Sequence, residues 1–486
     1  MSSLGKRAFG IGSVSLLALA GCSGGTTEAD LGPSTFAVAV TAVNGSPDLP
    51  TAEMPLPANR GETIETWDFT VEARSPTGEP EPFDGFVRLD VRPGAIFAVS
   101  GEGAAGRNIK LTGGKASGSI TLTAVYGPAR LWAEDLGYHP VTPGSDEKPA
   151  CSNAADDDGD GLFDFPTDPG CAFADDDDEG GGTFAAGVSP PVQYALPKVS
   201  DVRGTGSETP YPYEAIEVNT SAPQRVVVTR VASDGFYVTD VNATEMSTGY
   251  NSLFAFSFNT PPGMRVCDVL TYLSGTANDF FGFTELSFPS FKVSFPLEGQ
   301  ACEVPEPTVI EPTTIADPIA MQKLQSSLVR VQGFHIAKNF GPGLAKNNVF
   351  APEASSCDFN GDGQVDFEAA DEGACSQVCD ADPDCSEWTA YSARGDYKIS
   401  KGTAMIKLQT GTVAGFDPTE QRGQVLGSVT GTLRKFSGGT LNWTIETRCV
   451  DDLACGLPGC GASQPVSSQT ACVRLRTIED NDQGTN

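Results

Sequence analysis

The chain has 486 residues and carries 63 acidic against 31 basic residues, for a formal net charge of −32. This length suits about two to four domains, and 55 Gly and 35 Pro with few long helical periodicities favour an all-β chain. Residues 197–307 alone hold 13 acidic and six basic residues, which argues against a nucleic-acid partner because phosphate backbones require a basic surface.

The first 22 residues have the pattern of an export signal. Lys6 and Arg7 give a positive start, residues 8–20 are small and apolar, and the run closes with Leu19-Ala20-Gly21-Cys22. Such a run is a secretory signal and is too short for a resident membrane helix. No other segment of the sequence is long and apolar enough to cross a bilayer.

The closing tetrapeptide resembles the lipobox of bacterial lipoproteins. In that family the Cys thiol is diacylated and becomes the mature N-terminus, which implies lipidation of Cys22 and a membrane anchor. An Asp after the lipid site marks inner-membrane retention in the family, so Ser23 implies the outer membrane, on its periplasmic or cell-surface side. We expect residues 23–34 to be a tether. The alternative is an ordinary signal peptide with a chance cysteine.

Thirteen cysteines suit a disulfide-containing exported protein. Lipidation of one leaves twelve, an even number, in an oxidising compartment. Zinc is the alternative for clustered cysteines, but His139 and His335 are the only histidines. The disulfide candidates are Cys151, Cys171, Cys267, Cys302, Cys357, Cys375, Cys379, Cys385, Cys449, Cys455, Cys460 and Cys472.

Residues 35–140 predict a β-sandwich. Apolar and polar side chains alternate at 66–73, 86–91 and 119–125, with turn residues between these segments. The segment 129–135 resembles the last strand of bacterial immunoglobulin-like domains. That resemblance implies an immunoglobulin-like sandwich.

The block at 192–310 is a second segment rich in predicted strands. A strand at 225–231 leads through a turn into 236–240, and segments at 264–270 and 281–286 follow. Their order resembles the OB-fold modules beside the catalytic domains of secreted bacterial nucleases. In those modules a GFYxxD-like strand precedes a GDxVxVxG strand and an FGxTEL turn, which implies an OB-like barrel here.

Cys267 stands where these modules have Gly, a departure that a Cys267–Cys302 disulfide explains. The block at 311–455 repeats the alternation and predicts a second OB-like barrel, with an acidic loop inserted at 356–387. The tail at 456–486 is rich in turn residues, and we expect disulfides to hold it.

Two windows carry most of the surplus negative charge. Residues 151–180 hold eleven acidic residues and residues 357–387 hold ten, and neither window contains Lys or Arg. The first window lies in a Pro/Gly/Asp-rich connector at 141–191. Charge needed only for solvation would be spread along the chain, whereas metal loops concentrate it.

Residues 156–164 fit the spacing D-x-D-x-D-G-x-x-D. Calcium takes about six to eight oxygen ligands, and alternate carboxylates of a tightly wound loop point inward. Gly161 permits the sharp turn. The pattern resembles EF-hand and thrombospondin type 3 loops, but Thr167 occupies the twelfth position, so either Asp168 closes the loop or binding is weaker. The expected ligands are Asp156, Asp158, Asp160, the Leu162 carbonyl, Asp164 and Asp168.

Residues 358–366 repeat this spacing and also resemble a dockerin loop, although the paired helices of a dockerin are missing. The twelfth position is Ala369, so Glu368 or Asp371 would close the loop. We expect about two structural calcium ions in the chain. A solvated acidic turn is the alternative for each loop. The ligands expected here are Asp358, Asn360, Asp362, the Gln364 carbonyl, Asp366 and Asp371.

Catalytic motifs are missing from the sequence. It contains no G-x-S-x-G, no H-E-x-x-H and no phosphate-binding Gly loop, and neither histidine lies in a known catalytic pattern. The framework at 151–171 resembles segments in lipoproteins of myxobacteria. We therefore expect a non-enzymatic envelope lipoprotein; a calcium-dependent phosphodiesterase is the catalytic alternative.

The leading hypothesis is a calcium-stabilised scaffold or binding module, anchored by its lipid, with a protein or glycan partner in the cell envelope. The alternative is an accessory binder of nucleic acid or polysaccharide, related to the nuclease OB modules. This alternative depends on whether six phenylalanines are exposed, at positions 254, 256, 258, 280, 281 and 283. We expect them in the barrel core, although exposed rings could stack on bases or sugars.

Overall fold

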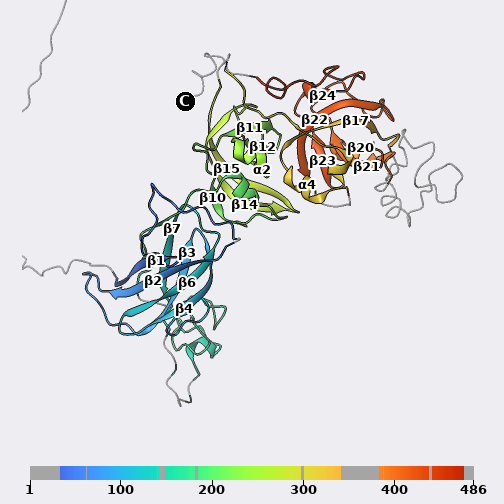
Figure 1. The fold of residues 1–486 in the computed structure, drawn as a ribbon. Coiled ribbons are helices and arrows are strands. Elements are labelled where there is room, and N and C mark those ends of the chain that lie inside the picture. Colours follow the sequence, from blue (N-terminus) through green and yellow to red (C-terminus); the bar gives the residue numbers. More distant parts are fainter. Residues whose placement is uncertain are drawn as a thin grey trace, which may run out of the picture.

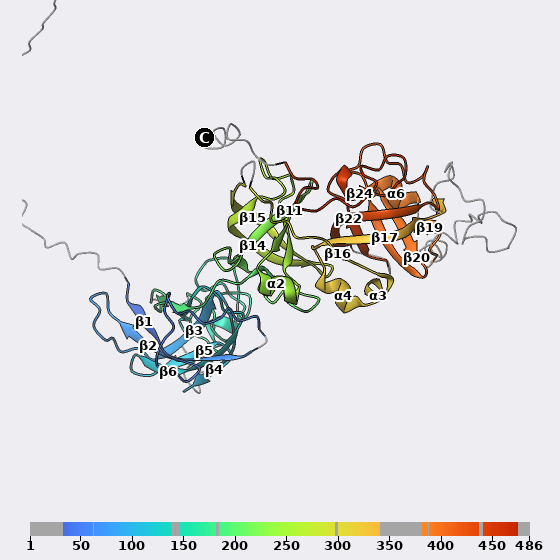
Figure 2. The same cartoon turned by 45° about the horizontal axis from the view of Figure 1, so that its top comes forward.

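The computed structural model describes residues 33–61, 63–138, 141, 146, 148–180, 184–296, 300–340, 382–386, 388–436 and 441–474. The predicted all-β class is confirmed, with 41% strand and 8% helix. Figure 1 shows an N-terminal unit in blue, a first barrel in green and a second barrel in orange and red, and Figure 2 shows the same succession. None of the described helices is long and apolar enough to span a membrane.

The N-terminal unit consists of two sheets that share one buried core. Strand burial alternates with period two: Val87, Leu89 and Val91 are fully buried, whereas Arg88 and Asp90 are half-buried. Trp67 of the other sheet lies in the same core. One sheet has the order β1 (Thr35–Val43), β2 (Glu65–Arg74), β6 (Lys115–Thr123), β4 (Ala95–Gly101). The other has the order β5 (Asn108–Leu111), β3 (Gly85–Arg92), β7 (Pro128–Asp135), β8 (Gly187–Val188), and β9 (Val192–Gln193) also pairs with β7.

The first barrel is a closed ring of five strands. The order around the ring is β11 (Val226–Val231), β12 (Gly235–Asp240), β13 (Ser252–Phe256), β15 (Phe283–Ser294) and β14 (Val269–Phe280), and β14 returns to β11. β13 and β15 run parallel and the other pairs are antiparallel. The short strand β10 (Ala215–Glu217) and the helices α1 (Val199–Arg203) and α2 (Ala243–Thr248) complete this unit.

The second barrel closes in the same way. Its ring runs β17 (Leu328–Ile336), β20 (Asp396–Lys401), β21 (Ala404–Gln409), β23 (Trp443–Glu446), β22 (Val425–Lys435), and back to β17, with β21 and β23 parallel. Smaller elements accompany it: β16 (Thr308–Val309), α3 (Pro312–Ile315), α4 (Pro318–Lys323), β18 (Asn339–Phe340), β19 (Cys385–Ser386), α6 (Trp388–Arg394) and β24 (Leu453–Ala454).

Two segments of the first barrel differ from their sequence interpretation. The segment 264–270 is mostly a turn, in which the Asp268 carboxylate accepts a hydrogen bond from the Arg265 backbone, and β14 begins only at Val269. The turn expected at 281–286 is confined to Phe281 and Gly282, whose φ angles are 53° and 77°. Strand β15 begins directly afterwards at Phe283.

Four cysteine pairs lie at disulfide distance among the described residues. The Cα–Cα separations are 5.6 Å for Cys151–Cys171, 5.5 Å for Cys267–Cys302, 5.6 Å for Cys449–Cys472 and 5.8 Å for Cys455–Cys460. All fall within the usual range. Cys385 is also disulfide-bonded, and Cys357, Cys375 and Cys379 lie outside the described residues.

Buried charges join the two barrels. Arg230 of β11 forms an ion pair with Glu446 of β23, and both side chains are at most 10% exposed. Tyr237 donates its hydroxyl hydrogen to Glu446 over 3.1 Å, and Arg434 lies 3.8 Å from the same carboxylate. Burial opposes the charge on Arg230, yet the attraction of Glu446 raises the pKa of Arg230.

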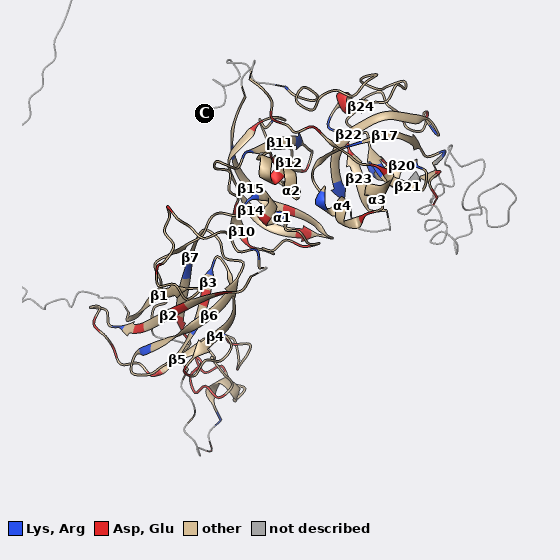
Figure 3. Ribbon diagram, in the orientation of Figure 1, with Lys and Arg blue, Asp and Glu red and all other residues tan. Residues whose placement is uncertain are grey.

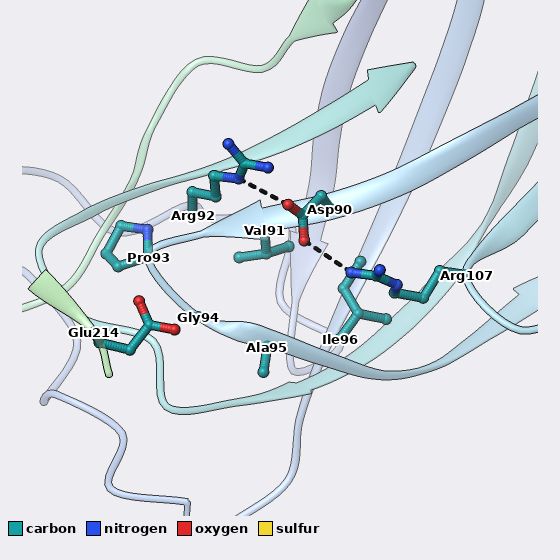
Figure 4. Close-up of a pocket in the computed structure, with 9 residues that line it drawn as sticks. All are labelled: Asp90, Val91, Arg92, Pro93, Gly94, Ala95, Ile96, Arg107 and Glu214. Atoms are coloured by element: carbon teal, nitrogen blue, oxygen red, sulfur yellow. Dashed lines mark hydrogen bonds and ion pairs between the residues drawn. The ribbon is translucent and has the colours of Figure 1, made fainter. Parts of the chain in front are cut away.

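The N-terminal unit packs against the first barrel through aromatic side chains. Tyr126 donates a 2.9 Å hydrogen bond to the Ala215 carbonyl and packs edge-on against Tyr211. Beside this contact a hollow of about 400 Å³ lies between the end of β3 and the barrel (Figure 4). On one wall Asp90 pairs with two arginines, and on the other burial and the Asp90 charge raise the pKa of Glu214.

The buried ion pair between the two barrels should be sensitive to the loss of either charge. We expect Glu446→Leu to lower the free energy of unfolding by about 3–5 kcal/mol, because Arg230 would keep a buried charge without its partner. Adding Arg230→Met should recover most of that loss. Arg92→Met provides the control, since Arg92 is 75% exposed and exposed pairs contribute less than about 1 kcal/mol. Urea denaturation measures all four proteins, and a Glu446→Leu variant as stable as the parent would contradict the prediction.

Candidate metal centre

The acidic module, residues 148–180, is docked on the N-terminal unit (Figure 3). The Phe173 ring packs edge-on against Phe86, at the start of β3, and against Tyr138, with ring centroids 5.6 and 4.9 Å apart. The Tyr138 hydroxyl donates to the Asp175 carboxylate over 3.0 Å. The predicted cysteines Cys151 and Cys171 form the bond that closes the module.

Three of the predicted ligands converge. Carboxylate oxygens of Asp156, Asp158 and Asp160 lie within 4.8 Å of one another, Asp156 half-buried and the other two exposed. No described Lys or Arg forms an ion pair with any of them. Three carboxylates gathered this closely repel one another, so a divalent cation among their oxygens would relieve that repulsion.

Backbone hydrogen bonds hold the loop tightly wound. The Asp156 carboxylate accepts from the amides of Gly159 and Gly161, over 2.7 and 3.1 Å. Asp158 accepts from the Asp160 amide, and Asp160 accepts from the Leu162 amide. Gly161 has a φ of 91°, in the left-handed region that the sharp turn requires.

Two further predicted ligands lie elsewhere. Both oxygens of Asp164 accept from the Ala154 amide, at 3.0 and 3.1 Å, so this side chain closes the neck of the loop. Asp168 is buried, and its carboxylate is grouped with Glu179 instead of with the three loop aspartates. Leu162 is 37% exposed, at the surface of the module.

Glu179 is a residue that the sequence interpretation missed. Its two carboxylate oxygens accept from the amides of Asp157, over 2.6 Å, and Asp164, over 3.1 Å, so one side chain bridges both ends of the loop. Glu179 lies beyond the spacing of any calcium-loop motif. The only signal in the sequence was its membership of the acidic run at 175–179.

The second predicted loop, at 358–366, belongs to the part of the chain that the structure does not describe. Asp358, Asn360, Asp362, Gln364, Asp366 and Asp371 all lie outside the described residues, as do Cys22 and His139. His335 is described and is half-buried on β17, where it pairs with Ser400 of β20.

A third group of possible ligands consists of Cys449, Asp451 and Cys472. The two cysteines form a disulfide, and a disulfide sulfur is not the thiolate that metals bind. This group is therefore structural.

The six singled-out phenylalanines of the first barrel divide between core and surface. Phe254 and Phe283 are buried as expected. The expectation is wrong for Phe258, Phe280 and Phe281, which are 59%, 53% and 67% exposed. They lie where β13 ends and at the β14–β15 turn, beyond the part of the sheet that the core covers.

A row of neighbouring phenylalanine rings runs from the barrel core to its surface, in the order Phe254, Phe256, Phe258 and Phe288. Half-buried Phe256 lies 6.3 Å from Phe254 and 4.3 Å from Phe258, and Phe258 lies 5.4 Å from Phe288, which is 70% exposed. Phe258, Phe281 and Phe288 all have φ between 53° and 61°. A left-handed backbone costs a bulky residue about 1–2 kcal/mol, and such strain is concentrated at functional sites.

Comparisons with known proteins found no relative of this chain. No family model matches the chain, and no match is found among curated proteins or solved structures.

The Cys151–Cys171 disulfide should help to keep the acidic module folded. We expect the double variant Cys151→Ser/Cys171→Ser to lower the stability of residues 148–180 by about 2–4 kcal/mol, because a covalent bond limits the unfolded ensemble. Hydrogen exchange of the module's amides reports the loss. The control is Cys455→Ser/Cys460→Ser, whose bond closes a separation of only five residues, far from the module. Unchanged protection at 153–180 in the first variant would contradict the prediction.

Proposed function

We propose that the chain is a non-catalytic, calcium-stabilised cell-envelope lipoprotein that acts as a scaffold or binding module. The convergence of Asp156, Asp158 and Asp160 within 4.8 Å carries the calcium part of this proposal. Hard oxygen donors in a flexible, wound loop suit Ca²⁺ better than Mg²⁺, which demands near-ideal octahedral geometry. The metal would stabilise the module, and through Phe173 the N-terminal unit to which it is docked.

The anchor in this proposal is the lipid on Cys22, argued from the signal-like sequence that precedes it. It would place the protein in the outer membrane, on the periplasmic or cell-surface side. The tether at 23–34 would hold the domains away from the bilayer. Calcium at the second loop, 358–366, belongs to the proposal on sequence spacing alone.

The domain types support a binding role. We assign an immunoglobulin-like sandwich to the N-terminal unit, from its two sheets around one core, and OB-like folds to both barrels. Each barrel has five strands with the third and fifth in parallel contact. Such folds host many functions, so their surfaces decide what they bind.

Calcium titration tests the proposal. We expect the melting temperature of residues 23–486 to rise with calcium, by an amount equivalent to about 2.7 kcal/mol at a hundredfold excess over Kd. Magnesium should have a smaller effect. Asp160→Asn should reduce the calcium response, because it removes one of three converging carboxylates.

Asp177→Asn is the matched control, since it removes the same charge from an exposed position in the same module. Its calcium response should equal that of the parent protein. A melting temperature that does not change with calcium in the parent protein would contradict the proposal.

A second candidate function is polysaccharide binding, favoured by the exposed end of the row of phenylalanine rings. Phe258 and Phe288 present neighbouring rings at the surface, and aromatic faces stack on flat, apolar ligand surfaces. The acidic balance of the barrel makes a neutral or cationic glycan a better partner than nucleic acid.

Binding measurements separate these ligands. We expect fluorescence anisotropy with envelope oligosaccharides to show binding that Phe258→Ala weakens about tenfold, equivalent to about 1.4 kcal/mol, because the aromatic face that contacts the sugar is removed. Phe97→Ala, which removes a ring that is 74% exposed on the N-terminal unit, should have no effect. Single-stranded oligonucleotides should give no signal at low salt. Equal affinity in the two variants would exclude this surface.

A further inference from the structure

Two carboxylates are buried side by side beneath the loop. Asp168 is 2% exposed and Glu179 is 1% exposed. Their possible ligand atoms lie within 4.8 Å of each other and of the Cys171 sulfur. Cys171 is bonded to Cys151 and has no thiolate to offer, so the chemistry here is that of the two carboxylates.

Hydrogen bonding orients the Glu179 carboxylate at both of its oxygens. Each of its oxygens accepts from a backbone amide, that of Asp157 or Asp164. The backbone at the two ends of the loop therefore fixes the position of this carboxylate.

Asp168 has one satisfied oxygen and one without a partner. Its Oδ1 accepts a 2.7 Å hydrogen bond from the Gly170 amide. Its Oδ2 is buried and has no hydrogen-bond partner. Buried polar atoms normally have a partner, so this oxygen is left for a ligand to satisfy.

No cationic side chain compensates the pair. Among the residues that the structure describes, no Lys, Arg or His forms an ion pair with Asp168 or Glu179. Buried charges are normally paired or bound to a metal. A buried carboxylate that has an unpartnered oxygen and lies within 4.8 Å of a second buried carboxylate is an arrangement that a bound cation would satisfy.

The backbone holds this pair in place before any ligand arrives. A side chain at Gly170 would collide with the Glu179 carbonyl, because a Cβ there would lie 1.7 Å from that oxygen. The Cys151–Cys171 bond fixes the same turn from its other side. The two segments therefore cross at the pair, which gives the site a preformed geometry.

We propose that Asp168 and Glu179 form a second cation site in the acidic module, distinct from the site of Asp156, Asp158 and Asp160. Two carboxylates with no nitrogen or thiolate donor select a hard divalent cation, and the irregular backbone around them suits Ca²⁺. The site extends the proposed calcium stabilisation and does not require the loop to bind metal.

Counting bound calcium tests the inference. Native mass spectrometry and equilibrium dialysis of the purified chain give the number of ions bound in the parent, Glu179→Gln, Asp168→Asn and Asp160→Asn proteins. We expect each single variant to bind one ion fewer than the parent. The double variant Asp160→Asn/Glu179→Gln should bind two fewer, because its substitutions affect separate sites.

Controls separate loss of the site from loss of the fold. Asp168→Asn keeps the Oδ1 that accepts from Gly170, so this variant should keep the module folded, as hydrogen exchange at 148–180 would show. Asp177→Asn should bind as many ions as the parent.

Each other outcome overturns the inference. An unchanged count in Glu179→Gln and Asp168→Asn would mean that a proton or a water molecule fills the space. A double variant that loses only one ion would mean that all these carboxylates share a single site. In both cases an ion lost in Asp160→Asn would leave the proposed function standing.

Discussion

Arg230 and Glu446 hold the two barrels in one arrangement, because neither charge can remain buried without the other. Each lies on a strand of a closed ring, so neither strand can slide without breaking the barrel to which it belongs. Arg434 adds a second cation to the same carboxylate, and its guanidinium lies 4.8 Å from the centre of the Phe254 ring. Phe254 is also the buried end of the row of phenylalanine rings that leads to Phe258. The exposed rings are therefore in contact, through Phe254, with the buried charges between the two barrels.

The other end of the chain is arranged around β3. Phe86 at its start contacts the acidic module, and Arg92 at its end lines the hollow against the first barrel. The core residues between them, such as Leu89, belong to a single packed layer. The module and the barrel therefore lie at opposite ends of the same strand. Strand β3 therefore links the contact with the module to the contact with the barrel.

The sequence predicted the parts of the site that depend on neighbouring residues. Alternate aspartates at 156, 158 and 160 converge because the turn at Gly161 is encoded locally. The all-β class followed from alternating segments such as 86–91, which became β3. The spacing could not reveal that Asp164 is used to cap Ala154, since that depends on where the chain enters the loop.

Contacts between distant segments of the chain could not be predicted from local sequence patterns. Glu179 reaches the loop only because the chain crosses itself at Gly170, and no local pattern encodes that crossing. Strands β20 and β21 are short, and their pairing with β17 and β23 is decided by ring closure. The positions of Phe258 and Phe281 were mispredicted because apolar type alone does not show where a strand passes beyond the core.

Strand β7 receives its last neighbours, β8 and β9, from residues 187–193, after the chain has left the sheet and passed through the acidic module. The module is thus an excursion whose two ends are fixed in one sheet. Closing a long excursion costs chain entropy, which grows with the number of free residues. The Cys151–Cys171 bond shortens the free part covalently, and an ion held between Asp168 and Glu179 would shorten it reversibly. The metal would then act as a removable cross-link that decides how firmly the edge of the N-terminal sheet is closed.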